Sequence, residues 1–104
     1  MKLPHADKAL IDAEKLRDYL LSSTHPVGRF KAPVFLRMGY SQNQWEQLAA
    51  DLRSQHLSSD VQEASESNYG MKYVIRARLK GPNGTAFEFV SVWIVLEGEN
   101  VPRV

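Results

Sequence analysis

The fold is decided by residues 71–96, which read MKYVIRARLKGPNGTAFEFVSVWIVL. Across residues 71–80, apolar side chains alternate with bases, which is the period-two pattern of a strand that buries one face. Residues 81–84, Gly-Pro-Asn-Gly, are a strong hairpin-turn signal, because proline sets φ and glycine permits positive φ. Residues 85–96 are largely apolar at both odd and even positions, which favours a central strand covered on both sides. The stretch therefore predicts an antiparallel hairpin.

Three helices are expected before this hairpin. Asp12 is a suitable N-cap for a helix over residues 13–21. The motif Ser41-x-x-Gln44 has the form of a capping box and opens a helix over about residues 42–56. Between them, a helix from about Arg29 ends at Gly39 and should bury one apolar face, formed by Phe30, Val34, Phe35 and Met38.

The remaining segments complete the expected fold. Residues 58–70 are polar and should form a loop, whereas residues 101–104 look like the start of a further strand. The chain ends at Val104, four residues into that strand, so we expect a truncated C-terminal strand. Together the elements predict a single α+β domain over residues 1–104, with about three N-terminal helices packed on a C-terminal antiparallel β-meander.

The composition is that of a globular protein. Hydrophobic residues make up 43% and charged residues 24%, which argues against disorder along the whole chain. No apolar run approaches the roughly 20 residues needed to cross a bilayer, and the N-terminal residues lack the apolar core of a signal peptide. The absence of cysteine excludes disulfides, thiolate metal sites and a cysteine nucleophile. We therefore expect a cytoplasmic protein without a membrane partner.

The net charge of +1 conceals an uneven distribution of charge. Residues 22–40 contain Arg29, Lys31 and Arg37 but no acid, and residues 71–80 contain four bases and no acid. An acidic stretch, residues 41–70, separates these two basic blocks. Two such blocks can form a local positive face on a nearly neutral protein.

Residues 24–31 are the most concentrated chemical feature of the chain. Gly28 just ahead of a helix leaves backbone N–H groups at a positive dipole end, where Arg29 and Lys31 add charge suited to an anion. His25 lies nearby in a turn-rich loop and can act as acid or base near neutrality. The alternative is structural: His-Pro-Val-Gly is a stiff turn between helices, and the two bases are ordinary solvated residues.

The basic strand face is a second candidate site. Its bases stand about 7 Å apart along one face, near the phosphate repeat of a nucleic-acid strand, and they are Lys72, Arg76, Arg78 and Lys80. A solvated sheet face, or an edge protected against aggregation, explains the same pattern. The three histidines, His5, His25 and His56, lack the spacing of metal ligands, so we expect neither a metal nor another cofactor.

Several stretches resemble an uncharacterised family of small bacterial proteins. The matching stretches are residues 1–4, 15–21, 25–32, 39–40, 81–84, 93–94 and 101–103, and the element His25-Pro26-Val27-Gly28-x-x-Lys31 is the most specific. Members of that family occur in gene pairs of the toxin–antitoxin kind and as C-terminal domains of polymorphic toxins. They continue past Pro-Arg with a short strand that carries Thr or Ser and Tyr, whereas this chain ends at Val104.

The order of elements is also similar to the barnase/EndoU/RelE-like ribonuclease superfold. Such enzymes cleave RNA without metal, by attack of the ribose 2′-OH on the adjacent phosphate. The resemblance implies RNA as substrate and a cognate antitoxin as protein partner. It implies catalytic roles for His25, Lys31 and Arg29, with substrate contacts from four further bases, Arg76, Arg78, Lys80 and Arg103. The competing interpretation is a non-catalytic interaction module, an antitoxin or accessory protein that binds a protein partner or RNA.

Overall fold

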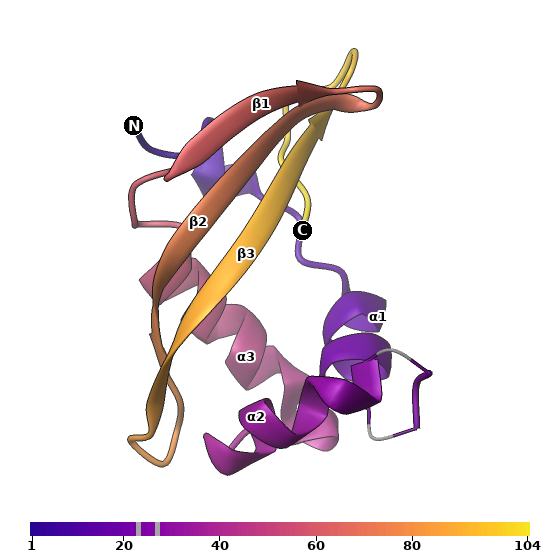
Figure 1. Cartoon of the computed structure of the whole chain (residues 1–104), viewed down its shortest axis with the longest axis vertical. Coiled ribbons are helices and arrows are strands. Elements are labelled where there is room, and N and C mark those ends of the chain that lie inside the picture. Colours follow the sequence, from indigo (N-terminus) through magenta and orange to yellow (C-terminus); the bar gives the residue numbers. More distant parts are fainter. Residues whose placement is uncertain (23, 27) are drawn as a thin grey trace.

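The computed structural model describes residues 1–22, 24–26 and 28–104, and it has the expected α+β architecture (Figure 1). Helical segments come first in the chain and a three-stranded antiparallel sheet, ordered β1-β2-β3, follows. The strands are β1 (Glu63–Ser67), β2 (Gly70–Lys80) and β3 (Ala86–Leu96). The predicted fold class is confirmed.

The helices are built from short consecutive segments of differing helical type. In chain order they are the 3-10 turn η1 (Ala6–Lys8), α1 (Ala13–Lys15) with its π-helical continuation η2 (Leu16–Leu20), the 3-10 turn η3 (Gly28–Phe30), α2 (Ala32–Arg37), the 3-10 turn η4 (Gln42–Gln44), α3 (Trp45–Asp51) and its π-helical continuation η5 (Leu52–His56). The predicted helix over residues 42–56 is therefore a continuous helical run, and the first helix ends one residue before its predicted limit.

The two predicted helix caps have different outcomes. The Asp12 side chain accepts a hydrogen bond from the Glu14 N–H at 3.1 Å, which confirms the first cap. Ser41 makes no side-chain capping bond, so the predicted capping box is wrong. The helix opens with a tight 3-10 turn, in which the Gln44 N–H already donates to the Ser41 carbonyl at 3.1 Å. That N–H is consequently not available to the Ser41 hydroxyl.

The predicted apolar face of the second helix is only half correct. Phe35 and Met38 are buried, but Phe30 is 71% exposed and Val34 is 38% exposed. Phe30 belongs to the 3-10 turn η3, which precedes α2 and winds at about 3.0 residues per turn rather than 3.6. The change of winding rotates Phe30 out of the face that a single α-helix would have presented.

The hairpin turn is docked against the end of α2. The Asn83 N–H donates to the Met38 carbonyl at 3.2 Å, and the Asn83 side chain donates to the Arg37 carbonyl at 2.7 Å. A Cβ on Gly81 would lie 2.3 Å from the Met38 carbonyl oxygen, so only glycine permits this approach. The turn predicted from sequence thus also ties the sheet to the helical layer.

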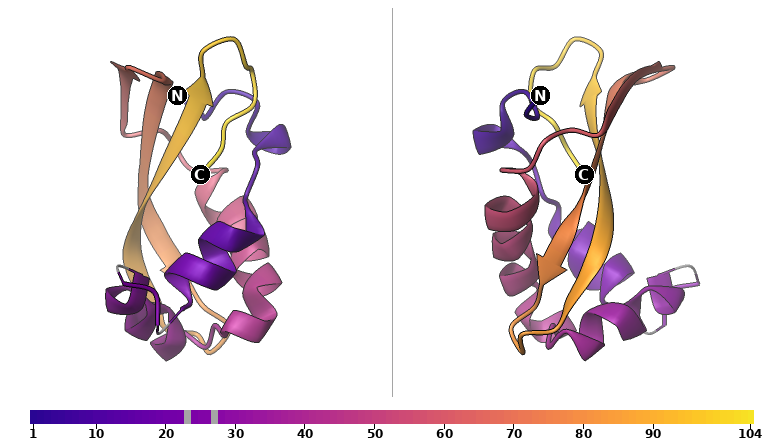
Figure 2. Two further views of the ribbon diagram at one scale, coloured as in Figure 1. Left: turned by 90° about the vertical axis from the view of Figure 1, so that its right-hand side faces the viewer. Right: turned by 60° about the vertical axis from the view of Figure 1, so that its left-hand side comes forward.

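One face of the sheet and the helices enclose the core. Tyr73, Ile75, Leu79 and Trp93 are buried on that inner face, and Figure 2 shows α3 lying against it. α1 and α2 lie beside β3 instead of over the sheet (Figures 1 and 2). The outer face, which carries the bases of β2, is exposed.

Two predictions about the sheet are wrong. Residues 63–67, expected to be loop, form β1, because pairing with β2 overrides their polar composition. β3 is an edge strand, not a central one, since β2 pairs with both β1 and β3. The segment after β3 adds only a single antiparallel bridge, between Ile94 and Arg103, and a parallel one between Arg103 and Leu10.

A buried polar network joins η5 to β3. Ser91 Oγ lies 3.0 Å from His56 Nδ1 and accepts a hydrogen bond from Trp93 Nε1 at 2.9 Å. The His56 and Trp93 side chains are fully buried. Burial lowers the pKa of His56 below its ordinary value, and the Ala77 backbone acts in the opposite direction. Burial therefore favours the neutral form of His56 in the folded protein.

This network predicts loss of stability at mildly acidic pH. An unfolded histidine has a pKa of about 6.5, so the unfolded chain takes up the His56 proton before the folded protein does. The free energy of unfolding should therefore be highest above about pH 6.5 and fall as the pH is lowered through that value. Urea unfolding between pH 5 and pH 8 measures how steeply the free energy of unfolding changes with pH. A His56→Gln variant should show a smaller slope than the parent. Equal slopes would exclude His56 as the cause.

Candidate functional site

The candidate site is built around the acid-free segment between η2 and α2. Gly28 is buried, and a Cβ placed on it would lie 1.8 Å from the Tyr19 carbonyl oxygen, so the segment crosses directly over the end of η2. Only glycine allows this approach of two backbones. Val27, the third residue of the His-Pro-Val-Gly motif, lies outside the described residues.

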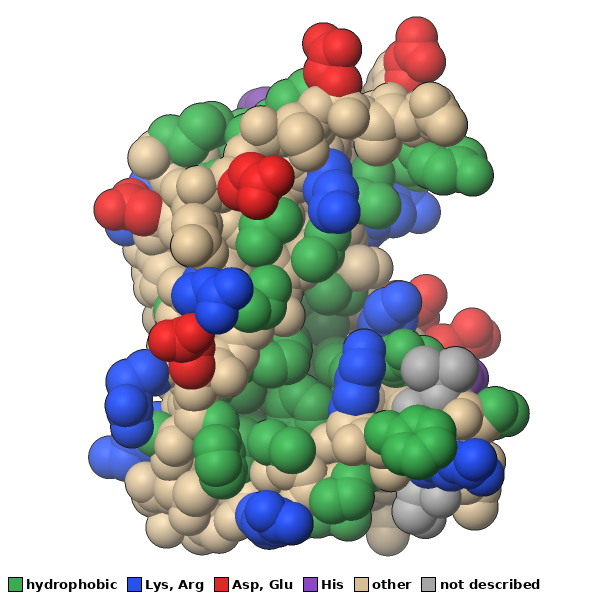
Figure 3. Space-filling view, in the orientation of Figure 1, with side chains coloured by type: hydrophobic (Ala, Val, Ile, Leu, Met, Phe, Trp, Pro, Cys, Tyr) green, Lys and Arg blue, Asp and Glu red, His purple; other side chains and the backbone are tan. Residues whose placement is uncertain are grey.

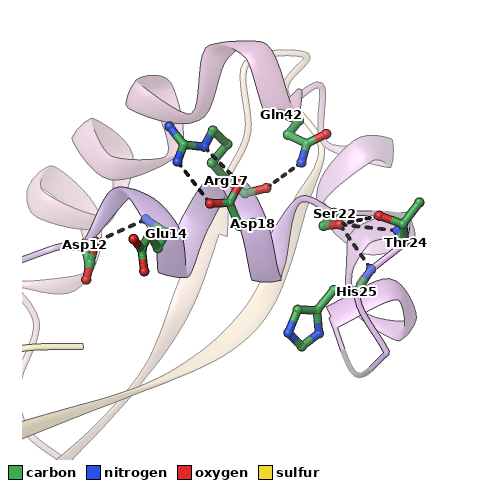
Figure 4. Close-up of polar contacts among 8 residues, drawn as sticks. All are labelled: Asp12, Glu14, Arg17, Asp18, Ser22, Thr24, His25 and Gln42. Atoms are coloured by element: carbon green, nitrogen blue, oxygen red, sulfur yellow. Dashed lines mark hydrogen bonds and ion pairs between the residues drawn. The ribbon is translucent and has the colours of Figure 1, made fainter.

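His25 is fixed in this turn by local hydrogen bonds. Its backbone N–H donates to Ser22 Oγ at 3.1 Å (Figure 4), and its ring Nδ1 accepts from the Gly28 N–H at 3.0 Å. Because Nδ1 acts as an acceptor, the neutral ring carries its proton on Nε2. His25 is therefore arranged as a hydrogen-bond donor through Nε2, whereas the sequence left open whether it would act as acid or base.

Tyr19 brings His25 together with two lysines. The His25 ring meets the Tyr19 ring edge-on, with centroids 4.7 Å apart. Lys15 Nζ and Lys31 Nζ lie 5.1 and 5.0 Å from the centroid of the Tyr19 ring, within the range of cation–π attraction. Lys31 Nζ also donates to the Tyr19 hydroxyl at 3.3 Å. We call Lys15, Tyr19, His25 and Lys31 the Tyr19 cluster.

Sequence reasoning placed His25 and Lys31 at the site but missed Tyr19 and Lys15. Both residues lie within the helix predicted over residues 13–21, and the sequence pattern assigns neither of them a role at the site. The available signal was the spacing of Lys15 and Tyr19, since residues four apart in a helix are neighbours on its surface. Within the described part of the chain, neither Lys15 nor Lys31 pairs with a carboxylate.

Three members of the cluster open onto a groove between the helices and β3. The groove has a volume of about 420 Å³, and its lining residues are Lys15, Tyr19, Leu20, Lys31 and Leu52 from the helices, Phe89, Val90, Ser91, Val92 and Ile94 from β3, and Val104. Figure 3 shows this hollow, with an apolar floor and basic side chains at its rim. The lining residues include no Asp or Glu side chain, so the side-chain charges favour an anion at the lysine rim.

Of the predicted site residues, only Lys31 lines the groove; His25 reaches it through its contact with the Tyr19 ring, and the other five are not in the lining. Arg76 on the outer sheet face forms an ion pair with Glu88 at 2.7 Å, and Arg103 forms one with Glu99 at 2.8 Å. Arg29 lies over the ring of Phe30, with 4.8 Å between its guanidinium carbon and the ring centroid. Arg78 and Lys80 are exposed on the outer face of the sheet. The structure thus brings His25 and Lys31 together at Tyr19, and none of these five bases lines the groove.

Three further features of the described residues limit the kinds of ligand and site that the protein can offer. A second depression, at the far end of the sheet, is lined by three glutamates, Glu66, Glu97 and Glu99, which disfavours an anionic ligand there. Across residues 1–22, 24–26 and 28–104, no three His, Asp or Glu side chains are grouped as metal ligands. No helix in the same residues is long and apolar enough to cross a membrane.

Residues 2–104 match the model of the family described as Domain of unknown function (DUF6883). The chain belongs to the DUF6883 family. Searches of curated proteins and of solved structures found no match. Because the DUF6883 match spans almost the whole chain, both the Tyr19 cluster and the β3 edge lie inside the family domain. The expectation of an uncharacterised family is confirmed at that level.

Proposed function

We propose that this DUF6883 domain is a metal-independent endoribonuclease of the toxin–antitoxin kind, acting on RNA in the cytoplasm. The observation that carries the proposal is the Tyr19 cluster, in which two lysines and a fixed histidine converge on one ring at the rim of a groove. The toxin–antitoxin setting, with a cognate antitoxin as partner, is supported by the family resemblance carried by the His25–Lys31 element.

The cluster suits the charge that develops during RNA cleavage. Attack of the ribose 2′-OH on the adjacent phosphate forms a new P–O bond while the P–O5′ bond breaks; the 2′-OH gives up its proton and the leaving 5′-oxygen takes one up. Negative charge builds on the phosphoryl oxygens during this exchange. Preorganised cations and donors near those oxygens are a large source of rate enhancement. Lys15 and Lys31 would neutralise the charge, and His25 would donate a hydrogen bond through Nε2. Arg78 and Lys80, on the outer face of the sheet, could hold a neighbouring part of the RNA backbone.

The test is cleavage of a labelled RNA by the purified protein in the presence of a chelator. The parent should cleave, and Lys31→Gln should slow cleavage by roughly 100-fold, the loss typical of removing one group that stabilises transition-state charge. His25→Ala should also reduce the rate. Lys8→Gln is the matched control, because it removes the same charge from an exposed position outside the groove; its rate should stay within about twofold of the parent. Cleavage that the chelator abolishes, or that survives unchanged in Lys31→Gln, would contradict the proposal.

A second candidate function is a non-catalytic interaction module. The specific observation in its favour is that Arg76 and Arg103 are already neutralised by glutamates, while the floor of the groove is apolar. Such a surface suits a protein partner as well as a nucleic acid. In that case RNA would yield no cleavage products, and any RNA affinity would fall steeply with salt.

A further inference from the structure

Phe30 presents its ring to solvent at the start of α2. Of the four phenylalanines it is the most exposed, at 71%, although Arg29 already lies over its ring with 4.8 Å between the guanidinium carbon and the ring centroid. Lys31, the next residue, is a member of the Tyr19 cluster, with its Nζ 5.0 Å from the Tyr19 ring centroid. Consecutive Cα atoms are only about 3.8 Å apart. A ligand a few nucleotides long can therefore contact both the ring and the lysine.

The charge around the Phe30 ring decides which ligand suits it. A single exposed apolar side chain is common on proteins and does not by itself mark a site. This ring, however, lies in a stretch without Asp or Glu from residue 19 to residue 45, which contains Arg29, Lys31 and Arg37. The planar guanidinium of Arg29 can stack on the ring and still offer donors to a phosphate. An apolar partner would desolvate these cations without pairing them, whereas an anionic ligand with flat apolar groups matches both features.

Tyr69 is an equally exposed ring in a different electrostatic setting. It is 72% exposed and lies in the turn between β1 and β2. Its carbonyl accepts a hydrogen bond from the Glu97 N–H at 2.9 Å. The turn borders the depression lined by Glu66, Glu97 and Glu99, where carboxylates disfavour a polyanion. The two rings are therefore matched in exposure but differ in the charges beside them.

From these observations we infer that Phe30 is a stacking platform for an unpaired base of single-stranded RNA, whose phosphates run past Arg29 and Lys31. Aromatic rings on a positively charged surface bind single strands in this way, because every base has a π-face. In a duplex the bases are paired and stacked inside the helix, so they do not reach the ring. The inference rests on the proposed function in taking RNA as the ligand, and it adds that this RNA is single-stranded at the site.

The direct test compares two fluorescent probes of eight nucleotides. Both carry 2′-O-methyl sugars, so no 2′-OH can attack a phosphate and an active enzyme leaves the probes intact. One probe alternates adenine with cytosine, and the other has the same sugars and phosphates without any base. The probe with bases should bind at least about tenfold more tightly by fluorescence anisotropy. It should also shift the ring-proton NMR resonances of Phe30, which the abasic probe and a duplex of the first probe should leave in place.

Three variants of the protein complete the test. Phe30→Leu removes the π-face but keeps an apolar side chain at an exposed position, where substitutions change folding stability little. It should weaken binding of the probe with bases by at least about fivefold, the contribution of one stacked base, and leave binding of the abasic probe unchanged. Phe30→Trp keeps a flat ring and should bind at least as tightly as the parent. Tyr69→Leu is the matched control and should bind within about twofold of the parent.

Several outcomes would overturn the inference. Two of them concern the parent: equal affinity for the two probes, or no binding of either. A Phe30→Leu variant that binds the probe with bases like the parent, or a Tyr69→Leu variant that loses as much affinity as Phe30→Leu, would also contradict it. Phe30 resonances that move with protein concentration, and not with the probe, would identify the ring as a contact between copies of the chain.

The result can be separated from that of the proposed function. A parent that binds the probe with bases through Phe30 but cleaves no natural RNA would refute the ribonuclease activity and leave the stacking platform standing. A parent that cleaves natural RNA, with a Phe30→Leu variant that cleaves and binds equally well, would refute the stacking platform alone.

Discussion

Replacing Ser91 by alanine is expected to lower the free energy of unfolding by about 3 kcal/mol. Ser91 Oγ is the hydrogen-bond partner of both Trp93 Nε1 and His56 Nδ1, at 2.9 and 3.0 Å, in the buried core. The substitution leaves two buried ring nitrogens without a partner, and each such loss costs about 1–3 kcal/mol. Urea unfolding followed by tryptophan fluorescence measures the change.

The matched control for Ser91→Ala is Ser58→Ala. Ser58 is exposed, and its hydroxyl donates only to the Ser54 carbonyl at 2.9 Å. The control should stay within about 0.5 kcal/mol of the parent, because exposed groups regain hydrogen bonds from water. If Ser91→Ala were as stable as Ser58→Ala, the network between His56 and Trp93 would not contribute to the stability of the core.

Gly28→Ala is expected to destabilise the protein by about 3 kcal/mol and to disturb the Tyr19 cluster. A Cβ on Gly28 would lie 1.8 Å from the Tyr19 carbonyl oxygen, which is backbone and cannot rotate away. The segment leading to Lys31 must then move off η2, and overpacking of this kind costs about 1–3 kcal/mol or more. Urea unfolding gives the energy, and two-dimensional NMR shifts of Tyr19 and Lys31 report the displacement.

Gly84→Ala is the control that separates the effect of a steric clash from the effect of an unfavourable backbone conformation. Gly84 has φ +86°, but nothing lies within 4 Å of an added Cβ. Its substitution should cost about 1 kcal/mol through positive φ alone and leave the resonances of Tyr19 and Lys31 unchanged. A Gly28→Ala variant that matched the Gly84→Ala variant in both respects would show that the crossing over η2 is not tightly packed.

The predicted elements that survived are those with strong local signals. The alternation in β2, the Gly-Pro-Asn-Gly turn and the long apolar periodicity of residues 42–56 all correspond to observed structure. In β2 and in residues 42–56, a repeat of buried side chains decides between strand and helix, whereas the turn follows from its proline and glycines. The Asp12 cap also survived, because it depends on atoms only two residues apart.

The predictions that failed required knowledge of neighbours distant in sequence. Glu63–Ser67 has no buried residue, and it is a strand only because it pairs with the edge of β2. The apolar residues on the outer side of β3 were interpreted as evidence that a further layer covers the strand. In the structure Val90 and Val92 line an open groove. Periodicity shows which side chains avoid water but not which element lies opposite them.

The sequence by itself determined the α+β class, the basic segment with which the site begins, and the candidate residues His25 and Lys31. Only the tertiary structure decided which side chains lie next to these two residues. It placed Tyr19 and Lys15 beside them through the crossing at Gly28. It separated them from the bases of β2, which are exposed on the outer face of the sheet, where Arg76 pairs with Glu88. The physical reason is that charge and hydrophobicity are properties of single residues, whereas a site depends on distances between atoms that only the packing of helices against β3 establishes.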